Sequence, residues 1–146
     1  MQIHTIYSDQ YMDTYYNDDL QLIEIYWKDT TENMTEAEYR MLLLDTLDNL
    51  EKGIEENSWK CSKILADNRS FLFTMSPRLQ EWQAKYVFAK LLGLGLQKSA
   101  IIMSQEFISQ FSIEQTLEEN TNINENNRYF DNIQEAKDWL SLEKVA

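Results

Sequence analysis

The chain has 146 residues, the size of one domain, and its 43% hydrophobic and 12% aromatic content is sufficient for a packed core. Its formal net charge is −12 at pH 7, and because so acidic a surface repels phosphate backbones and anionic bilayers, it disfavours nucleic acids and membrane surfaces as partners. Cys61 is the only cysteine, which excludes an internal disulfide and a metal site built from cysteines.

Two further features bear on location and metal binding. No apolar run approaches the length of a membrane span, and the first residues lack a charged start followed by an apolar stretch. We therefore expect a cytoplasmic protein without a membrane span. His4 is the only histidine and the acidic residues are mostly dispersed, so we expect no metal ion and no cofactor.

The first part of the chain reads as an antiparallel entry to a sheet. Residues 3–8 and 12–16 are short runs rich in β-branched and aromatic side chains, which favour strands. The polar triplet at 17–19 is typical of a turn. Residues 20–27 follow as another strand, with one well-buried face.

A helix is expected from Thr35 to about residue 56. Thr35 followed by Glu38 has the form of a capping box. Apolar residues then recur at steps of three and four, which predicts one core-facing stripe. The stripe consists of Tyr39, Leu42, Leu43, Leu47, Leu50 and Ile54. Gly53, near the end of the helix, is expected to be tolerated at a modest cost.

The central part of the chain reads as a buried strand, a polar turn and a helix. The strand is expected at 61–66, and the helix at 77–92, where Ser76 can cap it and Pro77 fits its first position. The run Gly93-Leu94-Gly95 should end this helix. Its inward side is expected to carry Leu79, Trp82, Tyr86 and Ala89.

The remaining elements complete an α/β pattern. A short buried strand is expected at 100–103, a weaker helix at 105–118, a polar loop at 119–128 and an edge strand at 128–130. Asp131 should cap the last helix, with Gln134 completing a capping box. The inward residues expected on this helix are Ile133, Ala136, Trp139 and Leu140. We predict a single α/β domain over 1–146, with a mixed four- to five-stranded sheet covered by about four helices.

Short motifs along nearly the whole chain also form a family pattern. The residues that carry it are Trp27 with Thr30, Thr35, the run Ala66-Asp67-Asn68-Arg69, Pro77 with Glu81 and Trp82, Gly95, Phe130, Ala136, Trp139 and Leu140. The pattern resembles the SpoIIAA-like branch of the STAS domains (sulphate transporter and anti-sigma-factor antagonist), which are related in architecture to the lipid-carrying CRAL-TRIO domains. The resemblance implies a four- or five-stranded sheet with helices packed on it. The chain departs from the family at the turn where antagonists carry a phosphorylated serine, because Asp67-Asn68-Arg69-Ser70 replaces the Asp-Ser-Ser-Gly motif. No phosphorylation site is carried over.

A candidate partner or ligand surface follows the strand at 61–66. In open α/β sheets, binding groups collect just past the carboxyl ends of the strands. The residues expected there are Asp67, Arg69, Ser76, Arg78, Glu81 and Trp82. A simpler interpretation is that Asp67 caps the turn and that Arg69 pairs with Asp67 or Glu81.

The sequence shows no catalytic constellation. Cys61 is expected to be a buried, inert thiol, and the glycines follow a helix instead of preceding one, unlike a phosphate-binding loop. Asp67 and Glu81 could form a carboxylate pair, but Arg69 and Arg78 would keep both ionised, which suits ion pairing better than acid catalysis. We therefore expect no enzyme activity.

Two function classes remain. The first is a regulatory or binding module that acts through protein–protein interaction, with self-association into a homodimer left open because exposed strand edges can pair. The second is a carrier of a small apolar or lipid-like ligand. The aromatic-rich segment that could line its pocket contains Phe71, Phe73, Met75, Trp82, Tyr86 and Phe88. Ordinary core packing is the competing interpretation of that segment.

Overall fold

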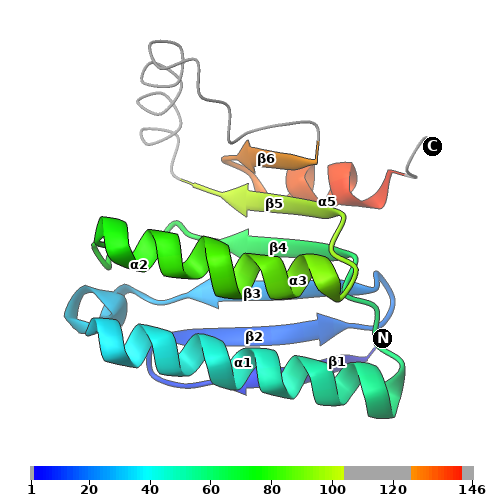
Figure 1. Ribbon diagram of the computed structural model, residues 1–146. Coiled ribbons are helices and arrows are strands. Elements are labelled where there is room, and N and C mark those ends of the chain that lie inside the picture. The colour runs from blue at the N-terminus through cyan, green and yellow to red at the C-terminus, as the bar shows by residue number, and fades with distance from the viewer. Residues whose placement is uncertain (1, 104–125, 143–146) are drawn as a thin grey trace.

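Six strands form one mixed sheet in a computed structural model that describes residues 2–103 and 126–142. They are β1 (Ile3–Ser8), β2 (Met12–Asn17), β3 (Leu22–Trp27), β4 (Lys63–Asp67), β5 (Lys98–Ile102) and β6 (Asn127–Phe130). The strands lie side by side in chain order, antiparallel from β1 to β3 and parallel from β3 to β6 (Figure 1). The predicted mixed sheet with an antiparallel entry is confirmed. The predicted four to five strands are too few, because both short N-terminal runs and the closing run pair as full members of the sheet.

Helices cover both faces of the sheet. On one face lie α1 (Glu36–Asn57) and a second helix that runs continuously through α2 (Pro77–Trp82), the π-helical η2 (Gln83–Phe88) and α3 (Ala89–Gly93) (Figure 1). On the other face lies α5 (Ile133–Ser141), and the 3-10 turn η1 (Asp29–Asn33) joins β3 to α1. The described residues thus hold three helices, and the fourth predicted helix, at 105–118, lies outside them, as does most of the predicted loop. No helix in the described parts has the length and apolar character needed to cross a bilayer.

The ends of the first two helices form by the local chemistry that the sequence predicts. Glu38 N donates to Thr35 Oγ1 at 3.1 Å, and Thr35 N donates to Glu38 Oε1 at 2.9 Å, which completes the capping box of α1. Leu79 N donates to Ser76 Oγ at 3.2 Å, so that Ser76 caps α2. Gly95 has a φ of 112°, a left-handed backbone that suits glycine at the end of the second helix.

Three local predictions need correction. The third strand begins at Leu22 instead of Leu20, because Gln21 takes a left-handed backbone with a φ of 51° that ends the turn. The last helix is capped by Asn132, whose Oδ1 accepts from Glu135 N at 2.9 Å, and not by Asp131. On the second helix, Leu79 and Val87 are buried, whereas Tyr86 and Ala89 are exposed.

Gly53 has a more specific role than the sequence indicates. A Cβ atom built on Gly53 would lie 2.0 Å from Cε3 of Trp59, far inside van der Waals contact. The indole of Trp59 therefore packs directly on the glycine backbone, after the chain has turned at Ser58, which has a φ of 59°. Glycine is required at position 53 because it leaves space for the indole, instead of being merely tolerated there.

The core has two layers separated by the sheet. Ile64 packs in a cluster on the α1 side that includes Leu50 and Trp59. Its neighbour Leu65 packs on the α5 side with Ala136 and Leu140. Strand alternation thus sends successive residues of β4 into opposite layers, and the interior position predicted for 64–66 is confirmed for Ile64 and Leu65.

Candidate functional site

The turn after β4 contains the first pair of predicted site residues. Arg69 Nε donates to Asp67 Oδ1 at 3.0 Å and Arg69 Nη2 donates to Asp67 Oδ2 at 2.7 Å, while the backbone N–H of Arg69 also donates to Oδ1 at 3.1 Å. Burial disfavours the charged carboxylate, but these bonds and the guanidinium charge outweigh it and lower the pKa of Asp67. The pair thus stabilises its own turn, as the simpler interpretation holds.

The other predicted site residues lie at the start of the second helix. Besides capping α2, Ser76 Oγ donates to Glu36 Oε1, which ties this helix to the start of α1. The side chain of Trp82 is half-buried under the guanidinium of Arg40, 4.8 Å from the ring centroid. Arg78 and Glu81 are exposed. Within 2–103 and 126–142, no hydrogen bond or ion pair joins Asp67 or Arg69 to this second group, so the six residues do not form one polar cluster.

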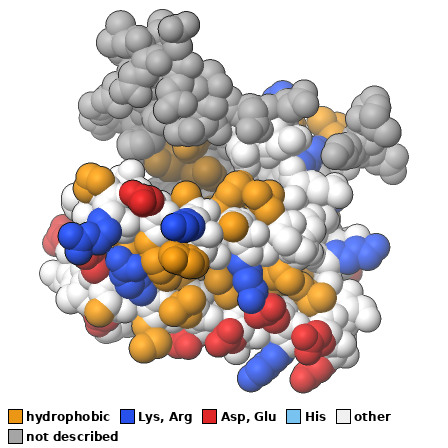
Figure 2. All heavy atoms as spheres, in the orientation of Figure 1, with side chains coloured by type: hydrophobic (Ala, Val, Ile, Leu, Met, Phe, Trp, Pro, Cys, Tyr) orange, Lys and Arg blue, Asp and Glu red, His pale blue; other side chains and the backbone are white. Residues whose placement is uncertain are grey.

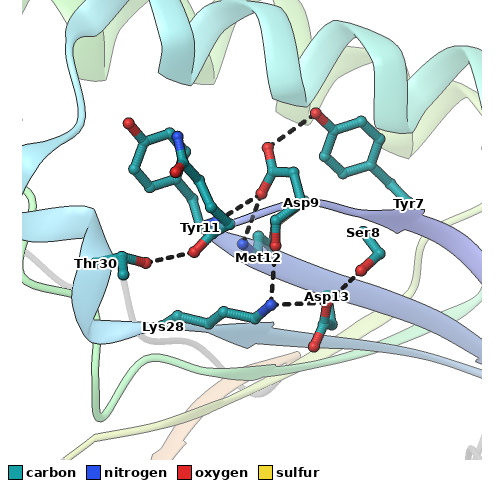
Figure 3. Close-up of polar contacts among 9 residues, drawn as sticks. Tyr7, Ser8, Asp9, Tyr11, Met12, Asp13, Lys28 and Thr30 are labelled. Atoms are coloured by element: carbon teal, nitrogen blue, oxygen red, sulfur yellow. Dashed lines mark hydrogen bonds and ion pairs between the residues drawn. The ribbon is translucent and has the colours of Figure 1, made fainter.

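A polar network that the sequence analysis missed surrounds the turn between β1 and β2 (Figure 3). Asp9 Oδ1 accepts from the backbone N–H groups of Tyr11 at 2.7 Å and Met12 at 2.9 Å, and Asp9 Oδ2 accepts from Tyr7 Oη at 2.9 Å. Lys28 Nζ donates to the carbonyl of Asp9 at 2.8 Å and forms an ion pair with Asp13 at 3.2 Å. These groups satisfy one another, so the network holds the hairpin and the end of β3 together.

A buried carboxylate lies on the opposite face of the sheet from α1. Glu24 is buried, and its oxygens accept hydrogen bonds from Asn17 Nδ2 at 3.1 Å and from the hydroxyl of Tyr26. Burial and the neighbouring Glu24 raise the pKa of Tyr26. The partners of Glu24 are thus a neutral amide and a neutral phenol, and among the described residues no cation pairs with it.

A large hollow lies between the sheet and the two helices that cover the α1 face. It has a volume of about 680 Å³ and is lined by residues from all six strands, from α1 and from the second helix. Its walls are mostly aliphatic and aromatic. Representative wall residues are Ile25, Leu47, Ile64, Phe71, Val87 and Leu91.

The π-helical turn η2 forms one wall of this cavity. Gln83, Ala84, Val87 and Phe88 all belong to η2 and line the cavity. Ala84 and Phe88 are also exposed, Phe88 to 38%, so this wall of the cavity extends to the protein surface. π-helical turns occur frequently at functional sites, because the extra residue redirects side chains.

The polar atoms in the cavity wall fall into two groups. Tyr39 Oη donates to Gln83 Oε1, and Thr46 Oγ1 donates to the carbonyl of Leu42 at 2.6 Å. In contrast, the buried atoms Thr14 Oγ1 and Asn68 Oδ1 have no hydrogen-bond partner among the described residues. Buried polar atoms are nearly always paired, so each of these two needs an explanation.

The sequence located part of this site and missed its polar positions. Of the predicted aromatic-rich segment, Phe71, Met75 and Phe88 line the cavity. Phe73 and Trp82 instead pack on the core cluster around Tyr39 and Leu79, and Tyr86 is 57% exposed. The sequence could have indicated Thr14 as a site residue. One core-facing side of β2 carries Met12, Thr14 and Tyr16, and only the threonine among them is small and polar.

Two observations bear on nucleophilic chemistry and on metal binding in the described parts of the chain. Burial raises the pKa of the Cys61 thiol to about 11, which keeps the side chain protonated near neutral pH. No group of three or more His, Cys, Asp or Glu side chains that could hold a metal ion occurs within 2–103 and 126–142.

The fold and the cavity together define a single α/β domain with a six-stranded sheet and an apolar cleft on one of its faces. Comparisons with protein families, with curated proteins and with solved structures find no match. The STAS resemblance therefore stays a prediction that depends on the residues named above.

Proposed function

We propose that this protein is a non-enzymatic binding protein that carries a small, mainly apolar ligand in the cavity between the sheet and the second helix. The cavity itself is the observation that supports the proposal. Its volume of about 680 Å³ falls in the range of about 300–1,000 Å³ typical of small-molecule sites. Protein interiors otherwise contain few voids larger than a water molecule, so loose packing does not account for a hollow of this size.

The chemistry of the wall favours binding over turnover. The described residues that line the cavity include hydroxyl and amide side chains but no carboxylate, imidazole, ammonium or guanidinium group. Hydroxyls and amides orient a ligand by hydrogen bonds, whereas general acid–base catalysis uses groups that exchange protons near neutral pH. The proposed activity accordingly needs no cofactor.

Filling the cavity tests the proposal. Ala66 lines the cavity from β4, and we expect Ala66→Leu to weaken the binding of the uncharged fluorescent dye N-phenyl-1-naphthylamine at least tenfold. Ala89→Leu is the matched control, because Ala89 is exposed on α3 and does not line the cavity. Thermal unfolding of both variants establishes that they are folded.

Two results would count against carriage. The first is dye binding that Ala66→Leu and Ala89→Leu change equally, since the dye would then bind elsewhere. The second is a wild-type protein that neither binds the dye nor retains a small molecule detectable by native mass spectrometry after purification.

The second candidate is a regulatory module that binds another protein. It is favoured by large apolar side chains that α1, the second helix and the loop before it leave exposed, and Figure 2 shows hydrophobic atoms gathered on this face among charged ones. They are Met41, Leu44, Leu72, Tyr86, Phe88 and Leu92. This candidate predicts that Leu92→Lys abolishes capture of a defined partner protein, or of a second copy of the chain, while dye binding in the cavity is unchanged.

A further inference from the structure

The cavity wall carries information about the charge of its ligand. Among the described lining residues there is no Lys, Arg, His, Asp or Glu. A charged group transferred from water to such a site loses its hydration without gaining an ion pair, which costs far more free energy than an apolar wall returns. The site therefore selects against anions and cations, including the carboxylate form of a fatty acid.

Thr14 supplies a second, independent observation. Its side chain is fully buried, at 0% exposure, and lines the cavity, yet its hydroxyl has no hydrogen-bond partner among the described residues. An unpaired hydroxyl in the interior destabilises the folded protein, whereas valine would fill the same space without this cost. A bound ligand that forms a hydrogen bond with Thr14 Oγ1 would explain why a threonine occupies this position.

Thr14 and Asn68 lie too far apart to bind one small group. Thr14 pairs with Ile25 on β3, Ile25 pairs with Ala66 on β4, and Asn68 lies two residues beyond Ala66. With a strand spacing of about 4.8 Å and a rise of about 3.3 Å per residue, the two Cα atoms are about 12 Å apart. We assign the ligand's main polar group to Thr14, because it is the more deeply buried of the two.

We propose that the ligand, on the proposed function above, is an electrically neutral and mainly apolar molecule with a hydroxyl or carbonyl group hydrogen-bonded to Thr14 Oγ1. The threonine hydroxyl both donates and accepts, so either an alcohol or a carbonyl compound satisfies it. The rest of the molecule lies against the aliphatic and aromatic wall, where affinity comes from burial of apolar surface.

Matched probes test the charge and the hydrogen bond separately. The probes displace N-phenyl-1-naphthylamine from the wild-type protein at pH 7. For charge, 1-naphthamide is compared with 1-naphthoate, which has nearly the same shape but is ionised. We expect the amide to bind at least tenfold more tightly. For the hydrogen bond, 1-naphthalenemethanol is compared with 1-ethylnaphthalene in the wild type and in Thr14→Val. We expect the affinity ratio of alcohol to hydrocarbon to fall about three- to tenfold in Thr14→Val, the value of one hydrogen bond.

Thr14→Ser keeps the hydroxyl and should keep the wild-type ratio, which separates the hydrogen bond from a change in packing. Naphthoate that binds as tightly as naphthamide would overturn neutrality, and an unchanged ratio in Thr14→Val would overturn the role of Thr14. In both cases displacement of the dye would leave the proposed function standing. If the wild type binds neither dye nor probes, the proposed function fails and this inference fails with it.

Discussion

Thr14→Val should stabilise the ligand-free protein, although it replaces a residue in the proposed site. Valine has almost the shape of threonine and a high strand propensity, so the change removes the buried hydroxyl and little else. Thr14 Oγ1 has no hydrogen-bond partner among the described residues. Because burying an unpaired hydroxyl costs about 1–3 kcal/mol, we expect the free energy of unfolding to rise by at least about 1 kcal/mol.

Thr31→Val is a matched control, for which we expect a decrease in the free energy of unfolding. Thr31 is also fully buried, but its Oγ1 donates to the carbonyl of Lys28 at 2.7 Å and accepts from Leu72 N at 2.9 Å. Thr31→Val removes both of these part-buried hydrogen bonds, and the loss of each costs about 0.5–1.5 kcal/mol. The two chemically identical substitutions should therefore shift stability in opposite directions.

Urea denaturation without added ligand measures both effects. We expect the midpoint for Thr14→Val to lie above that of the wild type and the midpoint for Thr31→Val to lie below it, with unchanged m-values. In thermal unfolding, 1 kcal/mol corresponds to about 3 °C for a chain of this size. If Thr14→Val destabilises the protein as much as Thr31→Val does, then Thr14 has a partner in solution and the argument about the cavity is wrong.

Three further predictions concern single residues outside the cavity. Gly53→Ala should destabilise the protein by about 1–3 kcal/mol, despite a helix propensity that favours alanine, because the new methyl group meets Trp59. Gly93→Ala, where nothing lies within 4 Å of the added atom, should be neutral or stabilising in the same thermal unfolding assay. Asp67→Asn should be less stable than the wild type near neutral pH, and this difference in the free energy of unfolding should shrink as the pH falls below about 4. A carboxyl with a lowered pKa stabilises the folded state above its unfolded pKa of about 3.9, and this stabilisation is lost on protonation. A difference that is constant down to pH 2 would contradict this. Cys61, with a pKa raised to about 11, should react with a disulfide reagent at pH 8 at least about a hundredfold more slowly in the folded protein than in urea, and equal rates would show that the thiol is accessible.

Interactions that are local in the chain were predictable from the sequence. The capping box of Thr35 with Glu38 and the Ser76 cap before Pro77 each join atoms a few residues apart, so the residue types alone indicate them. The same holds for the strand runs, whose β-branched and aromatic side chains located each segment to within about two residues at each end, although the sheet was predicted to contain only four or five strands and contains six. The helix cap at Asn132 was misplaced by one position because Asp131 is an equally good capping residue and only the backbone geometry distinguishes them.

The tertiary structure decided the features that join distant parts of the chain. From the sequence, Gly53 is only a residue of low helix propensity. The structure shows that the chain turns back after the helix and packs the indole of Trp59 on the backbone of Gly53. The cavity exists because α1 and the second helix lie over the sheet without filling all the space above it, and η2 forms part of its wall. Thr14 on β2 and Phe88 on η2 meet the same hollow although 74 positions separate them in the sequence. Local propensity and periodicity determined which segments become strands and helices, whereas the distances and packing between those elements determined where a ligand can bind.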